Sequence, residues 1–290
     1  LKGWGWDSTF ISYAIDMIKT ADEKAQILAL LSKVKPTGDS WDSEYRKAQE
    51  LILELKEKTE DADAVITYLK ENISNADFRE KLIEQAIKVK DYSQALQFAN
   101  EGLLVDGKGR NGKQWMRFQL QIYQLMGDKE NIIPLAYYFV LNGYEMANDY
   151  KLLKKTVPAG LWKDYLKKLI ADLYAEKQWF DYDKISSVYI WEKMWDKYFT
   201  LLQNNVNFRN LEVAEKYLAN SYADELVALY AEQILLYMEQ FMGRKYYIEV
   251  CRYMRRMKKL GGSKTVDQLI ETLRTTYKNR RALLEELDNV

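Results

Sequence analysis

Apolar residues recur at helical spacing along most of the chain, most clearly in residues 112–126 and 222–242. In each of these segments, two apolar stripes run side by side. The stripes of 112–126 consist of Trp115, Phe118, Ile122 and Leu125, and of Met116, Leu120 and Tyr123. Those of 222–242 consist of Leu226, Tyr230, Ile234, Tyr237 and Phe241, and of Val227, Leu235 and Met238. A helix that is apolar on two sides is covered on two sides, so both segments are predicted to be inner helices.

Proline and glycine mark where these helices are expected to end. Pro36 is predicted to end the helix that contains the apolar run at 27–31, and Gly261 with Gly262 to end the helix before them. Thr156 is a candidate N-cap, which would place Pro158 in a first helical turn, where its missing N–H costs little.

Two further helix starts are expected from polar residues. Near the C-terminus, Thr265 and Gln268 are predicted to form a capping box that opens the last helix. Pro134 leaves two alternatives open. A helix capped by Asn131 tolerates this proline in its first turn, whereas a start at Asp128 places the proline inside the helix and implies a kink.

A turn followed by a new helix recurs along the chain. The segments are KDYSQALQFA from Lys90, GDKENIIPLA from Gly127 and GRKYYIEVCR from Gly243. The first two begin 37 residues apart, and the interval of 116 residues before the third leaves room for two degenerate copies, around WFDYDKISSVY and NLEVAEKYLANSY. This spacing is close to the roughly 34 residues of a tetratricopeptide unit.

The repeat predicts the fold class and the domain organisation. Because no segment alternates apolar and polar residues between hairpin turns, no sheet is expected. We predict an all-α superhelix, or solenoid, of about six to eight tetratricopeptide-like helical hairpins, each burying its apolar faces against its neighbours. Residues 1–290 are expected to form one helical-repeat domain, with a looser N-terminal helical subdomain at 1–36 allowed before the solenoid of 37–290.

Charge and cysteine content narrow the compartment and the partners. The sequence contains 43 basic and 43 acidic residues, so no net charge draws it to nucleic acid or to an anionic membrane. A single cysteine, Cys251, cannot close an intramolecular disulfide, which excludes a secreted disulfide scaffold and favours the reducing cytoplasm. The longest apolar stretch, IIPLAYYFVL, is about half as long as a membrane-spanning helix. No membrane partner is expected.

The last 48 residues, GRKYYIEVCRYMRRMKKLGGSKTVDQLIETLRTTYKNRRALLEELDNV, contain a basic, aromatic helix, a glycine stop and a final helix. That helix closes in an R-x-A-L-L-x-E-L-like motif of Arg281, Ala282, Leu283, Leu284, Glu286 and Leu287. This region resembles the C-terminal helical region of bacterial proteins that carry a SWIM-type zinc finger. The finger needs a C-x-C and C-x-H arrangement, whereas this chain has one cysteine and no histidine. The resemblance therefore implies zinc only in a region absent from this sequence, and no cofactor is expected in this chain.

The start of the sequence also leads us to expect a region that is absent from this sequence. Residue 1 is leucine, and LKGWGWDS has neither the basic start nor the apolar middle of a signal peptide. We therefore expect the chain to be part of a longer protein.

Residue types that perform catalysis are scarce. Without histidine there is no Ser/His/Asp or Cys/His pair. Cys251 lies at the border of an apolar stripe and is interpreted as a packed thiol, the alternative being a reactive thiol whose pKa is lowered by Arg252 and Arg255. The acidic runs DYD at 181–183 and EELD at 285–288 are candidates for a carboxylate pair, but acidic residues at helix ends and on solvated faces are far commoner. We predict that the chain is not an enzyme and that it has no small-molecule substrate.

One glycine-rich segment matches phosphate-binding patterns. GKGRNGK at 107–113 satisfies G-x-G-x-x-G and most of a phosphate loop, but Gln114 stands where Ser or Thr would bind magnesium, and a helix precedes it rather than a strand. A link between two hairpins is the favoured interpretation. Loose anion binding by Lys108, Arg110 and Lys113 is the alternative.

The clearest candidate interaction surface is basic. Residues of one helical arc, opposite the apolar stripe of 244–260, are Arg244, Lys245, Arg252, Arg255, Arg256 and Lys259. The excess continues with Arg274, Lys278, Arg280 and Arg281. These charges either form a solvated face paired with acids on adjacent hairpins or bind phosphates or an acidic partner.

Two functions follow from these patterns. The first is a scaffold that holds a protein partner on a surface lined by some of the 22 tyrosines. The alternative is a nucleic-acid-associated module that uses the basic C-terminal helices.

Overall fold

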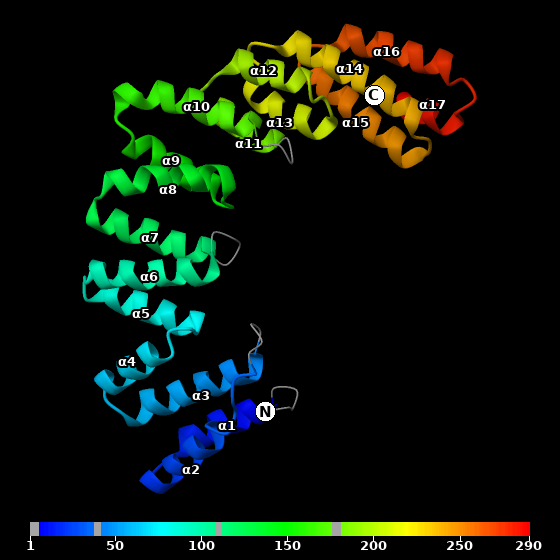
Figure 1. The fold of residues 1–290 in the computed structure, drawn as a ribbon. Coiled ribbons are helices and arrows are strands. Elements are labelled where there is room, and N and C mark those ends of the chain that lie inside the picture. Colours follow the sequence, from blue (N-terminus) through cyan, green and yellow to red (C-terminus); the bar gives the residue numbers. More distant parts are fainter. Residues whose placement is uncertain (1–5, 38–41, 108–111, 176–180) are drawn as a thin grey trace. The chain divides into compact units, whose positions relative to one another are not determined.

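The described part of the chain is entirely helical. The computed structural model describes residues 6–37, 42–107, 112–175 and 181–290, with side chains from residue 8 onward. In this part, seventeen α-helices and one short 3-10 helix follow one another and no strand occurs, which confirms the predicted all-α class (Figure 1). The helices fall into two compact units, Leu1–Pro158 (unit 1) and Ala159–Val290 (unit 2). The organisation expected from the sequence, one domain with a looser 1–36, stays a prediction.

The described residues of unit 1 form nine helices stacked in chain order. They are α1 (Trp6–Met17), α2 (Ala21–Leu31), α3 (Ser43–Thr59), α4 (Ala62–Glu71), α5 (Ala76–Lys88), α6 (Tyr92–Asp106), α7 (Gly112–Met126), α8 (Lys129–Asn142) and α9 (Met146–Thr156). From α3 onward each helix packs against the next one in the chain, as a helical-repeat stack requires (Figure 1).

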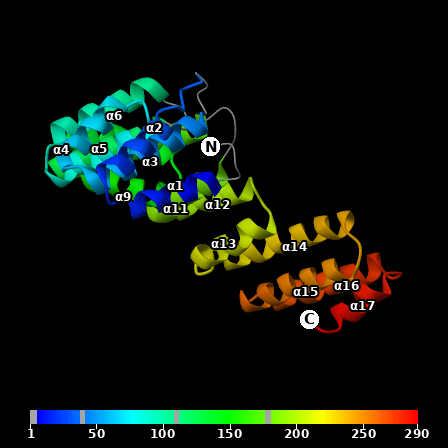
Figure 2. The same cartoon turned by 90° about the horizontal axis from the view of Figure 1, so that it is seen from below.

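Unit 2 continues the same all-helical pattern. Its described residues form η1 (Ala159–Leu161), α10 (Trp162–Ala175), α11 (Tyr182–Trp191), α12 (Trp195–Gln203), α13 (Phe208–Leu218), α14 (Ala223–Gln240), α15 (Arg244–Lys259), α16 (Ser263–Thr276) and α17 (Arg281–Leu287). Helices α10 to α15 again pack in chain order, while α16 contacts both α14 and α15, and α17 packs on α15 (Figure 2).

The two inner helices predicted from double apolar stripes are confirmed. Trp115 and Ile122 of α7 join a core formed by α3 to α7, whereas Met116 and Leu120 of the second stripe pack against α8. Leu125, at the end of the first stripe, is an exception because it is exposed. Helix α14 likewise packs against α13, α15 and α16.

Four of the joins between consecutive helices contain the same two-residue turn. The first turn residue has positive φ, and the second is already the N-cap of the next helix. The pairs are Lys90–Asp91, Gly127–Asp128, Lys193–Met194 and Gly261–Gly262. In each pair the two N–H groups donate to carbonyls of the preceding turn, for example from Lys90 to Ile87 at 3.0 Å and from Asp91 to Ala86 at 2.8 Å. This is a Schellman motif. It occurs at two of the recurring turns identified in the sequence, those at Lys90 and Gly127.

Two of the remaining predicted copies lie at other kinds of turn. The GRKYYIEV turn places Gly243, with φ of 126°, as the N-cap of α15. NLEVAEKYLANSY contains most of α13 and the turn before α14. WFDYDKISSVY contains most of α11, while its first two residues, Trp179 and Phe180, lie outside the described residues.

Several helix ends differ from the sequence-based expectation. Helix α2 ends at Leu31, five residues before Pro36, and its C-cap is Ser32, whose hydroxyl donates to the carbonyl of Leu28 at 2.7 Å. Thr156 is not an N-cap but the last residue of α9, where its hydroxyl donates to the carbonyl of Leu152 at 2.8 Å.

Of the two predicted N-terminal caps, one matches an alternative left open by the sequence and the other is wrong. Helix α8 starts after Asp128, whose carboxylate accepts the N–H of Asn131, so Pro134 lies inside the helix. The predicted capping box of Thr265 and Gln268 is wrong, because α16 begins earlier, at Ser263, with Gly262 as its N-cap and no side-chain cap bond.

The shared turn predicts opposite effects for two substitutions that exchange its first residue. Lys90 and Gly127 occupy equivalent positions with φ of 62° and 72°. A side chain with a Cβ is disfavoured there, whereas glycine is not. We expect Lys90→Gly to raise the free energy of unfolding of unit 1 by about 0.5–1 kcal/mol and Gly127→Lys to lower it by about 1 kcal/mol. Chemical denaturation followed by circular dichroism measures both.

Lys88→Gly is the matched control, because Lys88 lies in the last turn of α5 with no positive φ. Glycine there should destabilise the protein by about 0.5–1 kcal/mol. If Lys88→Gly and Lys90→Gly changed the free energy of unfolding in the same direction, the proposed role of the left-handed conformation at Lys90 would be contradicted.

Two arginines of unit 1 tie neighbouring hairpins together. Arg117 of α7 forms a two-pronged ion pair with the buried carboxylate of Asp149 on α9, with one N–O distance of 3.1 Å, and its guanidinium lies 3.7 Å from the ring centroid of Phe139. Arg79 of α5 is buried, and its guanidinium lies 4.9 Å from the ring centroid of Trp115 on α7. Each arginine therefore joins helices that are not consecutive in the chain.

Candidate functional site: a tyrosine-lined groove and a basic face

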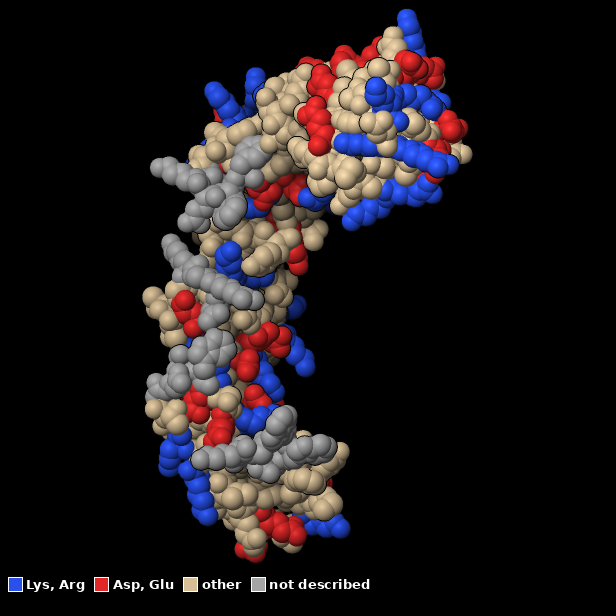
Figure 3. Space-filling model, turned by 90° about the vertical axis from the view of Figure 1, so that its right-hand side faces the viewer, with Lys and Arg blue, Asp and Glu red and all other residues tan. Residues whose placement is uncertain are grey.

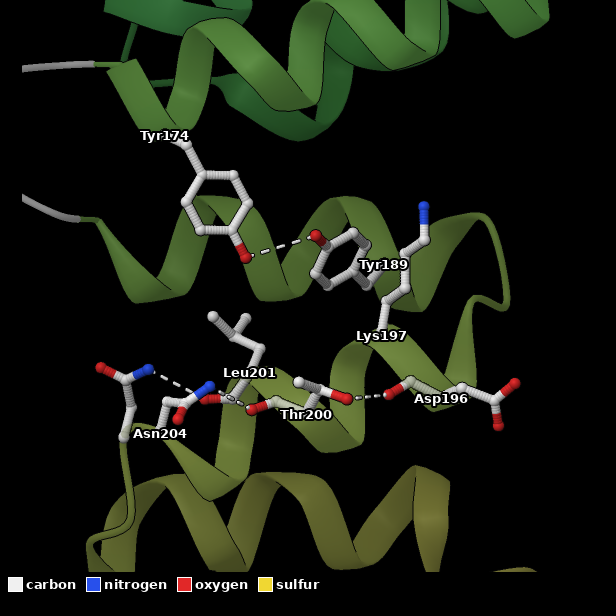
Figure 4. Close-up of a pocket in the computed structure, with 8 residues that line it drawn as sticks. Tyr174, Tyr189, Asp196, Lys197, Thr200, Leu201 and Asn204 are labelled. Carbon is white, nitrogen blue, oxygen red and sulfur yellow. Dashed lines mark hydrogen bonds between the residues drawn. The ribbon is translucent and has the colours of Figure 1, made fainter.

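A groove opens in unit 2 where α10, α11 and α12 meet. Its volume is about 470 Å³, within the range of roughly 300–1,000 Å³ that is usual for ligand pockets. We call it the tyrosine groove. It is lined by Tyr174, Tyr189, Asp196, Lys197, Thr200, Leu201, Asn204 and Asn205. Figure 4 shows the two tyrosines pointing toward each other from α10 and α11, with the other side chains supplied by α12 and the residues just after it.

The amphipathic pattern of α12 determines which of its side chains reach the groove. Tyr198 and Leu202 are buried in the interior of unit 2, whereas Lys197, Thr200 and Asn204 lie on the exposed side. Helix α12 is held between α11 and α13. Its polar side is therefore presented beside the tyrosines of the two preceding helices.

The hydrogen bonds of the groove leave acceptors available. The amide nitrogens of Asn204 and Asn205 donate to the carbonyls of Thr200 and Leu201, at 3.0 and 2.8 Å. No donor from the described residues reaches either Oδ1 atom. The hydroxyls of Tyr174 and Tyr189 lie 3.3 Å apart and share one hydrogen bond. The groove therefore offers carbonyl acceptors beside two aromatic rings.

One positive charge in the groove has no counter-ion among the described residues. The carboxylate of Asp196 accepts a hydrogen bond from the Tyr222 hydroxyl and points away from Tyr174 (Figure 4). That bond raises the pKa of Tyr222, while burial raises the pKa of Tyr189, so both phenols stay protonated at neutral pH. Lys197 is exposed and forms no ion pair with the described residues. An anionic group on a ligand would find its partner there.

The ten basic residues predicted as an interaction surface lie on α15, on α16, between α16 and α17, and on α17, and five of them are paired with acids. On α15, Arg252 pairs with Glu212 of α13 at 3.0 Å, and Arg256 pairs with Glu215 of α13, also at 3.0 Å. The remaining pairs join Arg244 to Glu285 and Glu286, Arg274 to Asp288, and Arg281 to Glu285. Figure 3 shows the result on unit 2, where blue and red side chains are intermixed.

The other five predicted basic residues have no acidic partner in the described part of the chain. Arg280 donates to the carbonyl oxygen of Met238 at 3.0 Å, and Lys278 is exposed and forms no ion pair with the described residues. Arg255 donates to the carbonyl oxygen of Asn289 at 3.2 Å, and the ammonium of Lys245 lies 4.5 Å from the ring centroid of Tyr246. Lys259 is exposed and forms no ion pair with the described residues.

An aromatic ladder beneath these ion pairs joins α13, α14 and α15. The rings of Phe208 and Tyr253 stack with centroids 3.8 Å apart, and Phe208 also meets Tyr237 edge-on at 5.2 Å. Tyr237 in turn donates its hydroxyl to Glu249 at 2.6 Å. Stacked rings and charge pairs therefore fasten α15 to its neighbours.

The candidate catalytic groups all have structural partners. Asp181 caps α11 by accepting the N–H of Lys184, and Asp183 pairs with Arg209 at 2.8 Å. The acids of the EELD run take part in the ion pairs of the basic face. Cys251 is buried, and burial raises its pKa to about 11, which outweighs the lowering by Arg255 and matches a packed thiol.

The GKGRNGK segment lies partly outside the described residues, including Lys108 and Arg110. Within the described part, helix α6 precedes it and α7 follows it, so the helical interpretation of its flanks is confirmed. Lys113 donates to the carbonyl of Asn142 at 2.7 Å and lies over the ring of Tyr144.

Comparisons with known proteins do not name a relative. The sequence matches no model of a protein family and no curated protein.

In the described part of the chain, no three Asp, Glu or Cys side chains are grouped so that they could hold a metal ion. None of the helices described has both the length and the apolar composition that crossing a bilayer requires.

Proposed function

We propose that this chain is a non-enzymatic helical-repeat scaffold, and that its tyrosine groove holds a peptide segment of a protein partner. The observation that carries the proposal is the groove itself. It combines two aromatic rings, the apolar side chain of Leu201, two amide oxygens and one ammonium that forms no ion pair with the described residues. Aromatic residues contribute strongly to protein interfaces. The amide oxygens suit the N–H groups of an extended peptide, because such a peptide has no internal partners for them.

The positive charge of Lys197 indicates which kind of peptide the groove is expected to bind. Lys197 favours a peptide that carries a carboxylate close to an apolar side chain. In such a complex the apolar side chain would lie against the tyrosine rings and the carboxylate beside the ammonium. The proposed setting is the cytoplasm, within a longer protein that carries a SWIM-type zinc finger. The proposal of a SWIM-type zinc finger rests on the C-terminal resemblance alone.

Selection from a random peptide library displayed on phage tests this proposal. We expect the wild-type chain to enrich peptides that combine an apolar residue with Asp or Glu. Lys197→Glu should remove the acidic preference, and Tyr174→Ala should weaken binding of the selected peptides at least tenfold. Fluorescence anisotropy of a labelled peptide measures both changes.

The matched control is Lys259→Glu, which makes the same charge change at an exposed lysine of unit 2 outside the groove. It should leave peptide binding unaltered. Failure to enrich any peptide, or equal losses for Lys197→Glu and Lys259→Glu, would rule out the groove as the binding site.

The alternative proposal is a nucleic-acid-associated module. It is supported by three residues of the predicted basic surface that have no acidic partner in the described part of the chain, namely Lys245, Arg255 and Lys259. Their reversal to Glu is a cleaner test than reversal of Arg252 or Arg256, because glutamate at either of those positions would face Glu212 or Glu215. If the module binds RNA or DNA at low salt, the triple reversal should abolish binding.

A further inference from the structure

Helix α1 carries apolar side chains on both of its faces. Its inner face places Ile11 and Ile15 in the core shared with α2 and α3. Its outer face presents Phe10, Tyr13 and Met17, which are 66%, 64% and 73% exposed. Because these three residues are spaced at i, i+3 and i+7, they form one continuous stripe along the helix. Single exposed apolar residues are normal, but a continuous stripe on an ordered helix is typical of an interaction site.

A hollow borders this stripe. A groove of about 260 Å³ lies between α1 and α2, and its lining residues are Ala14, Met17, Ile18, Glu23, Gln26 and Ile27. Exposed Leu30 of α2 adds further apolar surface to this pair of helices. The outer face of α1 thus contains both projecting side chains and a recess next to the small Ala14.

We propose that two copies of this chain associate through α1, with the two helices antiparallel and a two-fold axis between Tyr13 and Ala14. In this register Tyr13 of each copy lies opposite Ala14 of the other, and Phe10 lies opposite Met17. Large side chains therefore face a small residue or a flexible one. Sulfur–aromatic contacts of the Met17 and Phe10 kind are favourable. A two-fold contact of this type requires one surface to complement itself, and the order of residues in the stripe meets that requirement.

The charges around the stripe permit this approach. Asp16 pairs with Lys58 of α3 at 3.1 Å, and Glu23 accepts the N–H groups of Lys19 and Thr20 at 2.9 Å each. These acids are neutralised or hydrogen-bonded within one copy. These two acids of the described residues therefore do not meet the second copy as unpaired carboxylates, and the helix dipoles of the two copies are antiparallel.

The area of the contact sets its strength. Aromatic side chains bury about 150–250 Å² each when fully covered, so the stripe and the adjoining groove supply on the order of 500 Å² per copy. The total of about 1,000 Å² is at the lower end for specific interfaces. The dimer is therefore a reversible one that dissociates on dilution.

Sedimentation velocity over a hundredfold range of concentration tests the association. Wild-type protein should show a rising sedimentation coefficient, and Tyr13→Lys, which places two ammonium groups near the axis, should remain monomeric throughout that range. Met17→Lys is a second variant with the same expected result. Leu104→Lys is the matched control in the same unit, since Leu104 is 85% exposed on α6, and it should associate like the wild type.

Disulfide trapping tests the register. In a mixture of Phe10→Cys and Met17→Cys proteins, the mixed disulfide should exceed either symmetric one at least threefold, because residues 10 and 17 are opposed. The native Cys251 is buried and does not compete. A monomeric wild type, association that survives both lysine variants, or a predominance of symmetric disulfides would overturn the proposal.

Discussion

Replacing Arg117 by methionine is expected to lower the free energy of unfolding of unit 1 by about 3 kcal/mol. The carboxylate of Asp149 is buried, and Arg117 is its partner in the two-pronged ion pair. Without the guanidinium, a charged group stays in the interior with no counter-ion. Methionine preserves much of the packing against Phe139, so the loss reports mainly the unpaired charge. Chemical denaturation followed by circular dichroism measures the effect.

The two partners should not be equivalent. Arg117 is partly exposed, whereas Asp149 is buried, so Asp149→Asn leaves a guanidinium that water still reaches. We expect this change to cost only about 1–2 kcal/mol. In the double variant Arg117→Met/Asp149→Leu neither charge remains, and most of the stability should return.

The control is Arg209→Met, which removes the exposed pair with Asp183 and should change stability by less than about 1 kcal/mol. Equal losses for Arg117→Met and Arg209→Met would mean that burial of Asp149 has no energetic consequence.

The second large effect is expected at Gly102. This glycine of α6 lies against the ring of Trp115, and a Cβ added there would come within 2.5 Å of a ring carbon. The indole is fully buried, with Arg79 over its ring and Asp106 accepting its N–H, so it has no free space to move into. Gly102→Val should therefore destabilise unit 1 by about 3 kcal/mol or more, through overpacking and displacement of the tryptophan.

Leu104→Val is the matched control for Gly102→Val, because it introduces the same β-branched residue at an exposed position two residues along α6. Valine in a helix costs only a few tenths of a kcal/mol there, on the order of its propensity. Hydrogen exchange of the α6 and α7 amides, measured by mass spectrometry, would assign the loss to this contact. Protection that stays at the wild-type level in Gly102→Val would show that the tryptophan has another position available.

The buried faces of the helices could be predicted from sequence because each depends on local periodicity. The two stripes of residues 112–126 separate as expected, with Trp115 facing one hairpin and Met116 the next. The turns at Lys90 and Gly127 can be recognised for the same reason. Their shared hydrogen-bonded geometry cannot be predicted from sequence, because a lysine such as Lys90 gives no sign that its backbone adopts a left-handed conformation.

Helix starts are harder to predict because several polar residues compete for each cap. Asp128 and Asn131 both suit the role, and the carboxylate of Asp128 occupies it although this places Pro134 inside α8. Thr265 and Gln268 fit a capping box, but the helix has already started, immediately after the glycine turn at 261–262. Packing against neighbouring helices, rather than the cap itself, decides such cases.

The candidate sites depend on which helices become neighbours, and these neighbours cannot be predicted from the sequence alone. Tyrosines are expected from sequence to line an interaction surface, but selecting Tyr174 and Tyr189 requires knowing that α10, α11 and α12 meet. In the same way, the basic arc of α15 is visible in the sequence, whereas its pairing with Glu212 and Glu215 depends on contacts about forty residues apart in the chain. The helical wheel identifies the charges and not their partners.

The two-residue turn between α7 and α8 leaves no spare length between these two helices. In Gly127–Asp128 the first residue closes α7 and the second already opens α8. Each residue of an α-helix advances about 100° around its axis, so one residue inserted into this turn would rotate the apolar side of α8 away from α7 unless the turn itself were rebuilt. Natural changes in chain length should therefore accumulate at the longer joins, such as the four residues between Leu218 and Ala223, where slack already exists.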